Sequence, residues 1–305
     1  MVYANFWGLS FPPFADDNRP DTFVPVRSVS LALARLRYAL GTIRGAAALF
    51  GSPGIGKTRA VKMLLREFEA AGWLTAYLPN PSGTVDDIFA VLNPAGANQG
   101  KPAGIAGLQV FLSDLARANR PALLAVDDVQ AARGSDFLET LRTLLNMGTD
   151  ERRALSLLLI GQDGMERKLA VASSFNTRLD ARAIIEPMTD EETKLYILAR
   201  LKAAGSRHGI FTRQAAEMIV ELARGNPRQV NRLCDTALVV AFGLESTQVG
   251  PEIVEMAAGD LDILPGGAPF LLWPHPEPEG GGEEGGDAQS DDHAEDILAG
   301  LASGE

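Results

Sequence analysis

The chain has 305 residues, enough for one α/β domain and a smaller partner domain, and its formal net charge is −11. The charge is uneven: from Glu277 onward there are ten acidic residues and no lysine or arginine, which leaves 29 acidic against 28 basic residues before it. This near-neutral body argues against a large nucleic-acid footprint. A single cysteine, Cys234, excludes an intrachain disulfide, and three scattered histidines argue against a zinc site.

The N-terminus lacks the basic start and the apolar core of a signal peptide. No run approaches the ~20 apolar residues that a membrane-spanning helix needs. We therefore expect a cytoplasmic protein.

An aromatic, proline-rich stretch at 6–14 cannot form a long helix because Pro12 and Pro13 block one. It either lies on the core as an arm or lines an adenine pocket, since flat rings and stiff prolines suit a purine face. Residues 27–41 then predict an amphipathic helix with an apolar stripe at Leu31, Leu33, Leu36 and Leu40.

The most informative stretch is a glycine-rich turn, Gly51-Ser52-Pro53-Gly54-Ile55-Gly56-Lys57-Thr58. An apolar run at 46–50 precedes it and a helical pattern at 59–71 follows, which is the strand-to-helix context of a phosphate-binding loop. Its glycines allow backbone N–H groups to converge on phosphate oxygens, and the helix N-terminus adds a positive dipole. We expect Lys57 to reach the β- and γ-phosphates of ATP and the Thr58 hydroxyl to ligate Mg²⁺.

Another predicted apolar strand, at 121–126, ends in two carboxylates, Asp127 and Asp128. Buried charges need a partner or a metal. Beside a phosphate-binding loop, Asp127 is expected to hold Mg²⁺ through its water shell, and Asp128 to orient or deprotonate the attacking water. The strand at 155–161 ends at Gln162, which either senses the γ-phosphate or the lytic water, or simply ends the strand.

Strands and helices alternate up to Pro187, which predicts a parallel sheet covered on both faces. The predicted strands are 46–50, 73–78, 121–126 and 155–161, and the helices between them are 59–71, 84–92, 105–118 and 137–147, with a loop at 96–104. Beyond Pro187 only helices are predicted, at 189–204, 212–224, 227–242 and 251–258. Thr189 (in a capping box), Thr212 and Asn226 are their expected N-caps.

These patterns divide the chain into an N-terminal arm and helix (1–44), an α/β domain (45–187), a helical lid that closes over the nucleotide (188–262) and a tail (263–305). The tail is rich in proline, glycine and acids, and cannot bury enough apolar surface to offset its chain entropy, so we expect it to be disordered. Two apolar segments inside it, 270–273 and 294–302, are either docking motifs for a protein partner or plain tail residues.

Together the motifs resemble the AAA+ ATPases of the initiator-like group and, more narrowly, the ATPase domain of general secretion pathway protein A (the ExeA type). The resemblance covers about residues 1–260, with the motifs in family order. The residues that carry it are 6–9 with Pro13 and Phe14, 51–58, 127–130, 159–162, 176–179, 186–188, 225–228 and 231–234.

The resemblance implies a P-loop AAA+ fold, a homo-oligomer and two further site residues. Arg178 matches the arginine finger that reaches a neighbouring subunit's nucleotide, with Arg182 as a nearby alternative. Arg228 matches the second sensor, in the first turn of a lid helix, where the helix dipole disfavours a cation. Both arginines also have a plain interpretation as surface residues.

The chain departs from the family pattern at three points. Asp128 stands where the family usually has Glu, which predicts slow hydrolysis with binding retained. Arg59 stands where a second Thr is common, so contacts with the base or ribose differ. Secretion-type relatives continue into a membrane span and a peptidoglycan-binding domain, whereas this sequence continues into an acidic tail.

The expected function is that of an ATP-binding and ATP-hydrolysing homo-oligomeric switch or motor in secretion or envelope assembly. One alternative is a DNA-linked regulator of the transposition type, because the transposon ATP-binding subunits of the TniB and TnsC kind share this architecture. A nucleotide-gated scaffold with little hydrolysis, motivated by Asp128, is another. The protein client remains open in all three.

Overall fold

The computed structural model describes residues 2–263 except for 16–18, 20–21, 42–44, 80–83, 98–103, 132–135, 150–152 and 166–176. The chain divides into two units, Met1–Ala268 and Pro269–Glu305, and every described residue lies in the first. The predicted disordered tail beyond Ile263, with both of its apolar segments, therefore lies outside the described residues.

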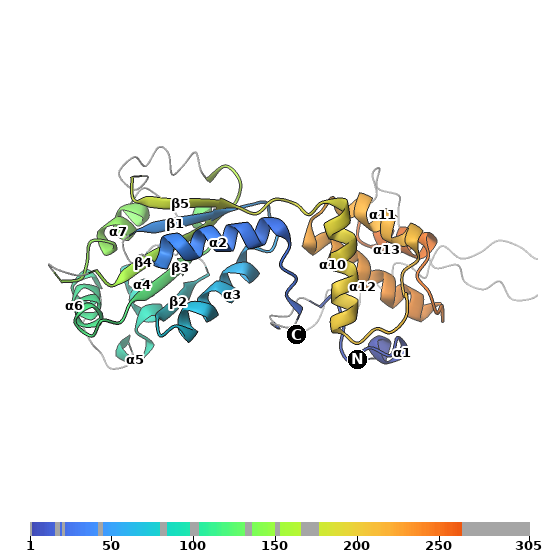
Figure 1. The fold of residues 1–305 in the computed structure, drawn as a ribbon, viewed down its shortest axis with the longest axis horizontal. Helices are drawn as coiled ribbons and strands as arrows, with labels where there is room; N and C mark the ends of the chain where they lie inside the picture. Colours follow the sequence, from blue (N-terminus) through green and yellow to red (C-terminus); the bar gives the residue numbers. More distant parts are fainter. Residues whose placement is uncertain are drawn as a thin grey trace, which may run out of the picture. The chain divides into compact units, whose positions relative to one another are not determined.

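The sheet is parallel, as predicted, and it has five strands, one more than the four located in the sequence (Figure 1). Its order is β2-β3-β4-β1-β5, so β1 lies between β4 and β5. The strands are β1 (Ala46–Phe50), β2 (Leu74–Leu78), β3 (Ala122–Val126), β4 (Leu155–Gly161) and β5 (Leu179–Ile184). Every residue of β1, β3 and β4 is buried, which is why these strands read as continuous apolar runs instead of alternating ones.

Helices cover both faces of the sheet (Figure 1). Ala47 and Leu49 of β1 share a hydrophobic cluster with α2 (Arg27–Gly41) and α3 (Lys57–Ala70). Ala48 and Phe50 face the opposite cluster, which holds three other helices: α4 (Val85–Leu92), α6 (Gly104–Arg117) and α7 (Asp136–Leu144). A short helix, α5 (Pro94–Ala97), overlaps the start of the predicted loop at 96–104.

The helix α2 has the predicted bounds but a different apolar stripe. Leu31 is 52% exposed, whereas Val29 is buried. The buried stripe therefore includes Val29, Leu33, Leu36 and Leu40, at spacings of four, three and four residues. Leu31 lies off this stripe because two residues along a helix are about 200° apart around its axis.

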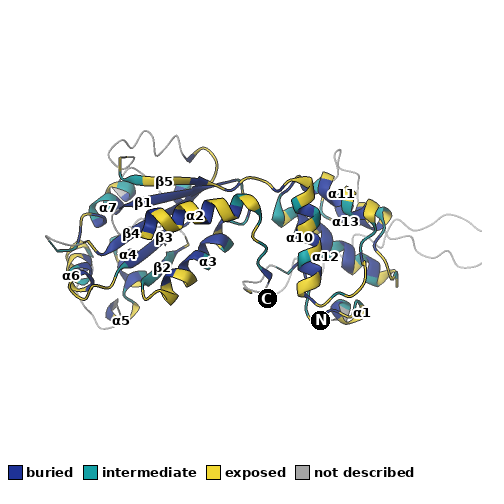
Figure 2. Ribbon diagram, in the orientation of Figure 1, coloured by how far each residue is buried: buried dark blue, intermediate teal, exposed yellow. Residues whose placement is uncertain are grey.

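A helical bundle follows the sheet. It comprises α10 (Asp190–Ala203), α11 (Arg213–Ala223), α12 (Pro227–Gly243) and α13 (Pro251–Asp260). The predicted N-caps are confirmed, because Thr189, Thr212 and Asn226 each accept a backbone N–H with their side-chain oxygen. Apolar faces of the four helices are buried against one another (Figure 2). Within the described residues, no helix is both long and apolar enough to cross a bilayer.

The N-terminal arm belongs to the bundle. A short helix, α1 (Val2–Phe6), precedes the aromatic stretch, and Leu9 and Phe14 are buried in the bundle core. Trp7 Nε1 donates a hydrogen bond to the carbonyl oxygen of Leu238 at 3.3 Å. Residues 6–14 therefore form an arm that packs on the core of the helical bundle, which is the first of the two interpretations given above.

Cys234 provides a test of this bundle. Its side chain lies on α12 with no exposed surface, and burial raises the pKa of its thiol well above the usual value. Because the thiolate is the reactive form, we expect the native protein at about pH 8 to react with a chromogenic disulfide reagent on the order of a hundredfold more slowly than the denatured protein. Absorbance reports this thiol alone, since it is the only cysteine. Rapid labelling of the native protein would contradict the packing of α12.

Candidate functional site

The glycine-rich turn joins the end of β1 to the start of α3, as predicted. Gly54 has φ +79°, in the region that side chains rarely adopt, and Gly56 has φ +98° as the residue before α3. A Cβ on Gly54 would also lie 2.9 Å from Cβ of Arg228 and 2.9 Å from Oδ1 of Asn226. The turn thus needs glycine both for its backbone and for the close approach of α12.

Lys57 is held inside this turn. It is 8% exposed, and its Nζ donates hydrogen bonds to the carbonyl oxygens of Gly51 (2.7 Å) and Ser52 (3.0 Å). Burial lowers the pKa of Lys57, and the carboxylates of Asp127, Asp163 and Asp128 act in the opposite direction. A cation is therefore fixed at the carboxyl end of β1, beside a group of acids.

Asp127 is the centre of the hydrogen-bond network. It is 4% exposed, and its Oδ2 accepts from Thr58 Oγ1 and from Tyr77 OH, each at 2.7 Å. Its Oδ1 accepts from the backbone N–H of Asp128 at 2.8 Å. The structure thus brings Thr58 and Asp127 together, and a hydroxyl beside a carboxylate fits the oxygen-ligand preference of Mg²⁺.

Tyr77 was not predicted as a site residue. It lies on β2, and burial together with the hydrogen bond to Asp127 raises its pKa, so the phenol stays a donor. The only signal in the sequence is a polar side chain inside an apolar strand. That signal does not identify its partner, which lies 50 residues further along the chain.

Asp128 adopts a left-handed backbone conformation, with φ +49°. Asp and Asn are enriched in this conformation, which gives a physical reason for an aspartate at this position. Its Oδ1 accepts from Gln130 Nε2 at 2.9 Å, and Gln130 Oε1 accepts from the backbone N–H of Gln162 at 3.1 Å. The ends of β3 and β4 are thereby joined, and Gln162 is exposed at that edge.

The start of α12 contacts the turn directly. Asn226 Nδ2 donates to the carbonyl oxygen of Pro53 at 2.9 Å, while Asn226 Oδ1 accepts from the backbone N–H of Arg228 at 3.0 Å. The same N–H also lies 3.3 Å from the carbonyl oxygen of Gly54. Arg228 is near enough to Lys57 to lower the pKa of that lysine further. The predicted second-sensor position therefore lies beside the loop.

Arg178 does not lie beside the glycine-rich turn. It immediately precedes β5, and its carbonyl oxygen accepts from the backbone N–H of Ala46 at 3.0 Å. Because β1 and β5 are parallel, this places Arg178 at the amino edge of the sheet, whereas the glycine-rich turn leaves the carboxyl edge. Arg182 lies within β5, and Asn176 of the same motif lies outside the described residues.

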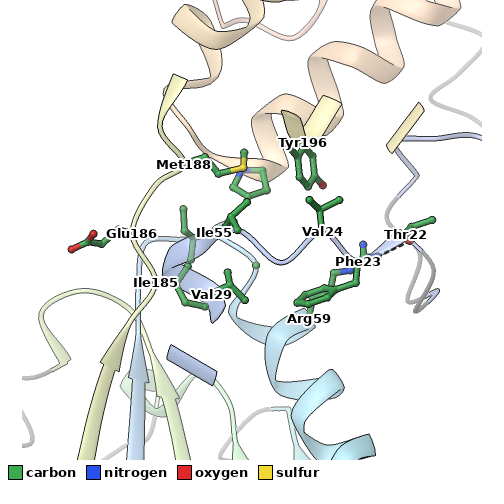
Figure 3. Close-up of a pocket in the computed structure, with 13 residues that line it drawn as sticks. Thr22, Phe23, Val24, Val29, Ile55, Arg59, Ile185, Glu186, Met188 and Tyr196 are labelled. Atoms are coloured by element: carbon green, nitrogen blue, oxygen red, sulfur yellow. Dashed lines mark hydrogen bonds between the residues drawn. The ribbon is translucent and has the colours of Figure 1, made fainter. Parts of the chain in front are cut away.

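A largely apolar pocket, partly open to solvent, adjoins the turn (Figure 3). Its walls come from the segment before α2, from the turn and α3, from the chain after β5, and from the bundle. Its lining residues include Thr22, Phe23, Val24, Ile55, Arg59 and Tyr196. None of residues 6–14 lines it, so the aromatic arm is not the wall of this pocket.

Arg59 shapes one side of this pocket. Its Nη2 donates to Thr22 Oγ1 at 2.6 Å (Figure 3) and also to the carbonyl oxygen of Arg19 at 3.1 Å. Its guanidinium carbon lies 5.9 Å from the centre of the Phe23 ring. Arg59 thus ties α3 to Arg19, Thr22 and Phe23, a contact that the sequence did not predict.

The sequence is similar to known proteins over most of its length. Residues 42–169 match the AAA domain family. The chain is 32% identical over 267 residues to general secretion pathway protein A of Aeromonas hydrophila, in an alignment that covers 85% of this chain and 48% of that protein. The chain therefore spans about half the length of this relative.

Solved structures share the fold. ORC2 of Aeropyrum pernix, in its ADPNP–ADP complexes, superposes with a TM-score of 0.65 at 18% identity over 81% of this chain and 71% of that one. Cdc6p of Pyrobaculum aerophilum gives 0.64 at 20% identity over 81% and 70%. The AAA+ fold predicted from the motifs is confirmed.

The double role of Asn226 can be separated by mutation. Asn226→Ala removes both the cap of α12 and the bond to Pro53, so we expect the free energy of unfolding to fall by about 1 kcal/mol. Asn226→Asp keeps a capping oxygen but lacks the N–H donor, so it should be the more stable variant of the two. Urea denaturation measures both. Equal stabilities of the two variants would mean that the cap contributes nothing.

Proposed function

Because residues 42–169 belong to the AAA domain family, we propose that this protein binds ATP at the turn 51–58 and hydrolyses it. The observation that best supports this is the arrangement of Lys57, Thr58 and Asp127. The lysine lies in the turn, and the hydroxyl and carboxylate meet at 2.7 Å beside it. A phosphate-binding loop with a paired magnesium site has this composition.

In this proposal the backbone N–H groups of the turn and Lys57 bind the phosphates, and Thr58 and Asp127 hold Mg²⁺. The ion would neutralise charge on the β- and γ-phosphates. Asp128 directs a water at the γ-phosphate, with Gln162 and Arg228 placed to sense that phosphate. The base occupies the pocket between Thr22, Arg59 and Tyr196, which is apolar with a few polar groups, as base-binding sites usually are.

We further propose that residues 188–262 act as a lid whose position follows the nucleotide state. The support is the pair of contacts from Asn226 and Arg228 to the tip of the turn. A change in the turn on hydrolysis would move the start of α12, and with it the bundle.

The position of Arg178 supports a homo-oligomer. An arginine at the amino edge of the sheet is remote from the nucleotide bound at the carboxyl edge of the same copy. It can serve as a finger only for the nucleotide of a neighbouring copy.

The cellular role that we favour is a switch or motor in secretion or envelope assembly, on the basis of the similarity to general secretion pathway protein A. ATPase activity with and without duplex DNA tests the DNA-linked alternative, which requires stimulation that weakens steeply with salt. Turnover indistinguishable from background would instead favour the nucleotide-gated scaffold.

Two substitutions separate binding from hydrolysis. Lys57→Ala should weaken ATP binding at least about tenfold and abolish turnover, since it removes the cation at the phosphates. Asp128→Asn should bind ATP as the parent does and lose turnover about a hundredfold or more, because the base is lost while the shape is kept. Arg66→Ala, an exposed change on the same helix α3, is the control. Parent-like binding and turnover in Lys57→Ala would place the site elsewhere.

Mixing two inactive variants tests the oligomer. Arg178→Ala keeps an intact turn but lacks the finger, whereas Lys57→Ala lacks the turn's lysine but supplies the finger. If the finger acts between copies, the mixture should regain a fraction of parent ATPase activity that neither variant shows alone. A mixture no more active than the sum of its parts would contradict a finger acting in trans.

A further inference from the structure

Arg200 is a fully buried arginine on α10, with 0% of its surface exposed. Its guanidinium donates to three backbone carbonyl oxygens: those of Pro13 (2.6 Å, from Nε), Ala15 (2.9 Å, from Nη2) and Thr22 (3.2 Å, from Nη1). Burying a guanidinium costs free energy that an apolar side chain would not. The rigid fork of donors, which neither lysine nor leucine has, is what this position uses.

These carbonyls belong to residues of the segment that lies between α1 and α2 in the chain. Thr22, 1% exposed, is held from two sides. Its carbonyl oxygen accepts from Arg200 of the bundle, and its Oγ1 accepts at 2.6 Å from Arg59 of α3, next to the phosphate-binding turn. One residue therefore connects the helical bundle to the helix that begins at Lys57.

Thr22 is also the first of the segment's residues to line the pocket, followed by Phe23 and Val24. A further wall comes from Tyr196, which lies one turn before Arg200 on α10 and donates through its hydroxyl to Asn231 Oδ1 at 3.0 Å. Two of the pocket's walls thus depend on the position of α10: Tyr196 directly, and the 22–24 segment through Arg200.

We propose that Arg200 and Arg59 are positioning residues that hold Thr22, and with it the wall of the base pocket, so that recognition of the nucleoside is coupled to the helical bundle. The proposal rests on the proposed function, because it assigns the base of the nucleotide to this pocket. It predicts a specific signature: loss of the Thr22 contacts weakens binding of the nucleoside part and spares binding of the triphosphate part.

The test compares two ligands, ATP and inorganic tripolyphosphate, in the full chain. Thr22→Val removes the hydroxyl at nearly constant volume, and Arg200→Lys keeps the charge but not the three-way fork. Each should weaken ATP about tenfold while tripolyphosphate changes less than about twofold. Lys202→Met, an exposed change on the same helix, should alter neither affinity.

The outcomes are distinguishable. Equal weakening of both ligands, or unchanged ATP affinity in Thr22→Val, would overturn the positioning role. Lys57→Ala must weaken both ligands; if it does not, the proposed function fails instead. If Arg200→Lys does not fold, Thr22→Val still tests the side-chain contact with Arg59, and an unchanged ATP affinity there still overturns the positioning of Thr22.

A double-variant comparison tests the bond between Arg59 and Thr22. Because Arg59→Met and Thr22→Val both remove the hydrogen bond between these two residues, the double variant should lose less ATP affinity than the sum of the two single losses. Additive losses would mean that the two residues act independently.

Discussion

The carboxylate of Asp127 receives three donors from separate parts of the chain: the Thr58 hydroxyl, the Tyr77 phenol and the backbone N–H of Asp128. A buried carboxylate needs such partners, because an unpaired charge in a closed environment is costly. Meeting that requirement fixes the first turn of α3, the edge strand β2 and the end of β3 relative to one another. The oxygen-rich corner beside Lys57 is therefore held together by contacts within the chain itself.

The parallel sheet explains why these groups meet. Loops that leave the carboxyl ends of β1, β3 and β4 emerge on one edge, and β1 lies inside the sheet with neighbours on both sides. The turn at 51–58 is consequently surrounded by the acids after β3, the amide after β4 and the start of α12. The same geometry separates Arg178 from this edge, because it precedes its strand. The parallel arrangement of the strands therefore gathers the turn, the acids and Gln162 at one edge of the sheet and places Arg178 at the opposite edge.

Much of the sheet and the central site could be predicted because the signals are local. Continuous apolar runs located β1, β3 and β4, and capping residues such as Thr189 and Asn226 located the helices of the bundle. The sequence did not predict the wall of the pocket, because residues 22–24 have no periodic pattern and are held by Arg200, more than 170 residues away in the chain. The contact of Tyr77 with Asp127 was missed for the same reason. The strand β5 was not located individually, since an edge strand is only partly buried.

Gly54 faces the first turn of α12, and a methyl group there would overlap Arg228 and Asn226. The absence of a side chain at this position is thus imposed by the neighbouring helix as well as by the backbone conformation of the turn. A larger residue at position 54 would push the start of α12 away from the turn and so separate the helical bundle from the sheet.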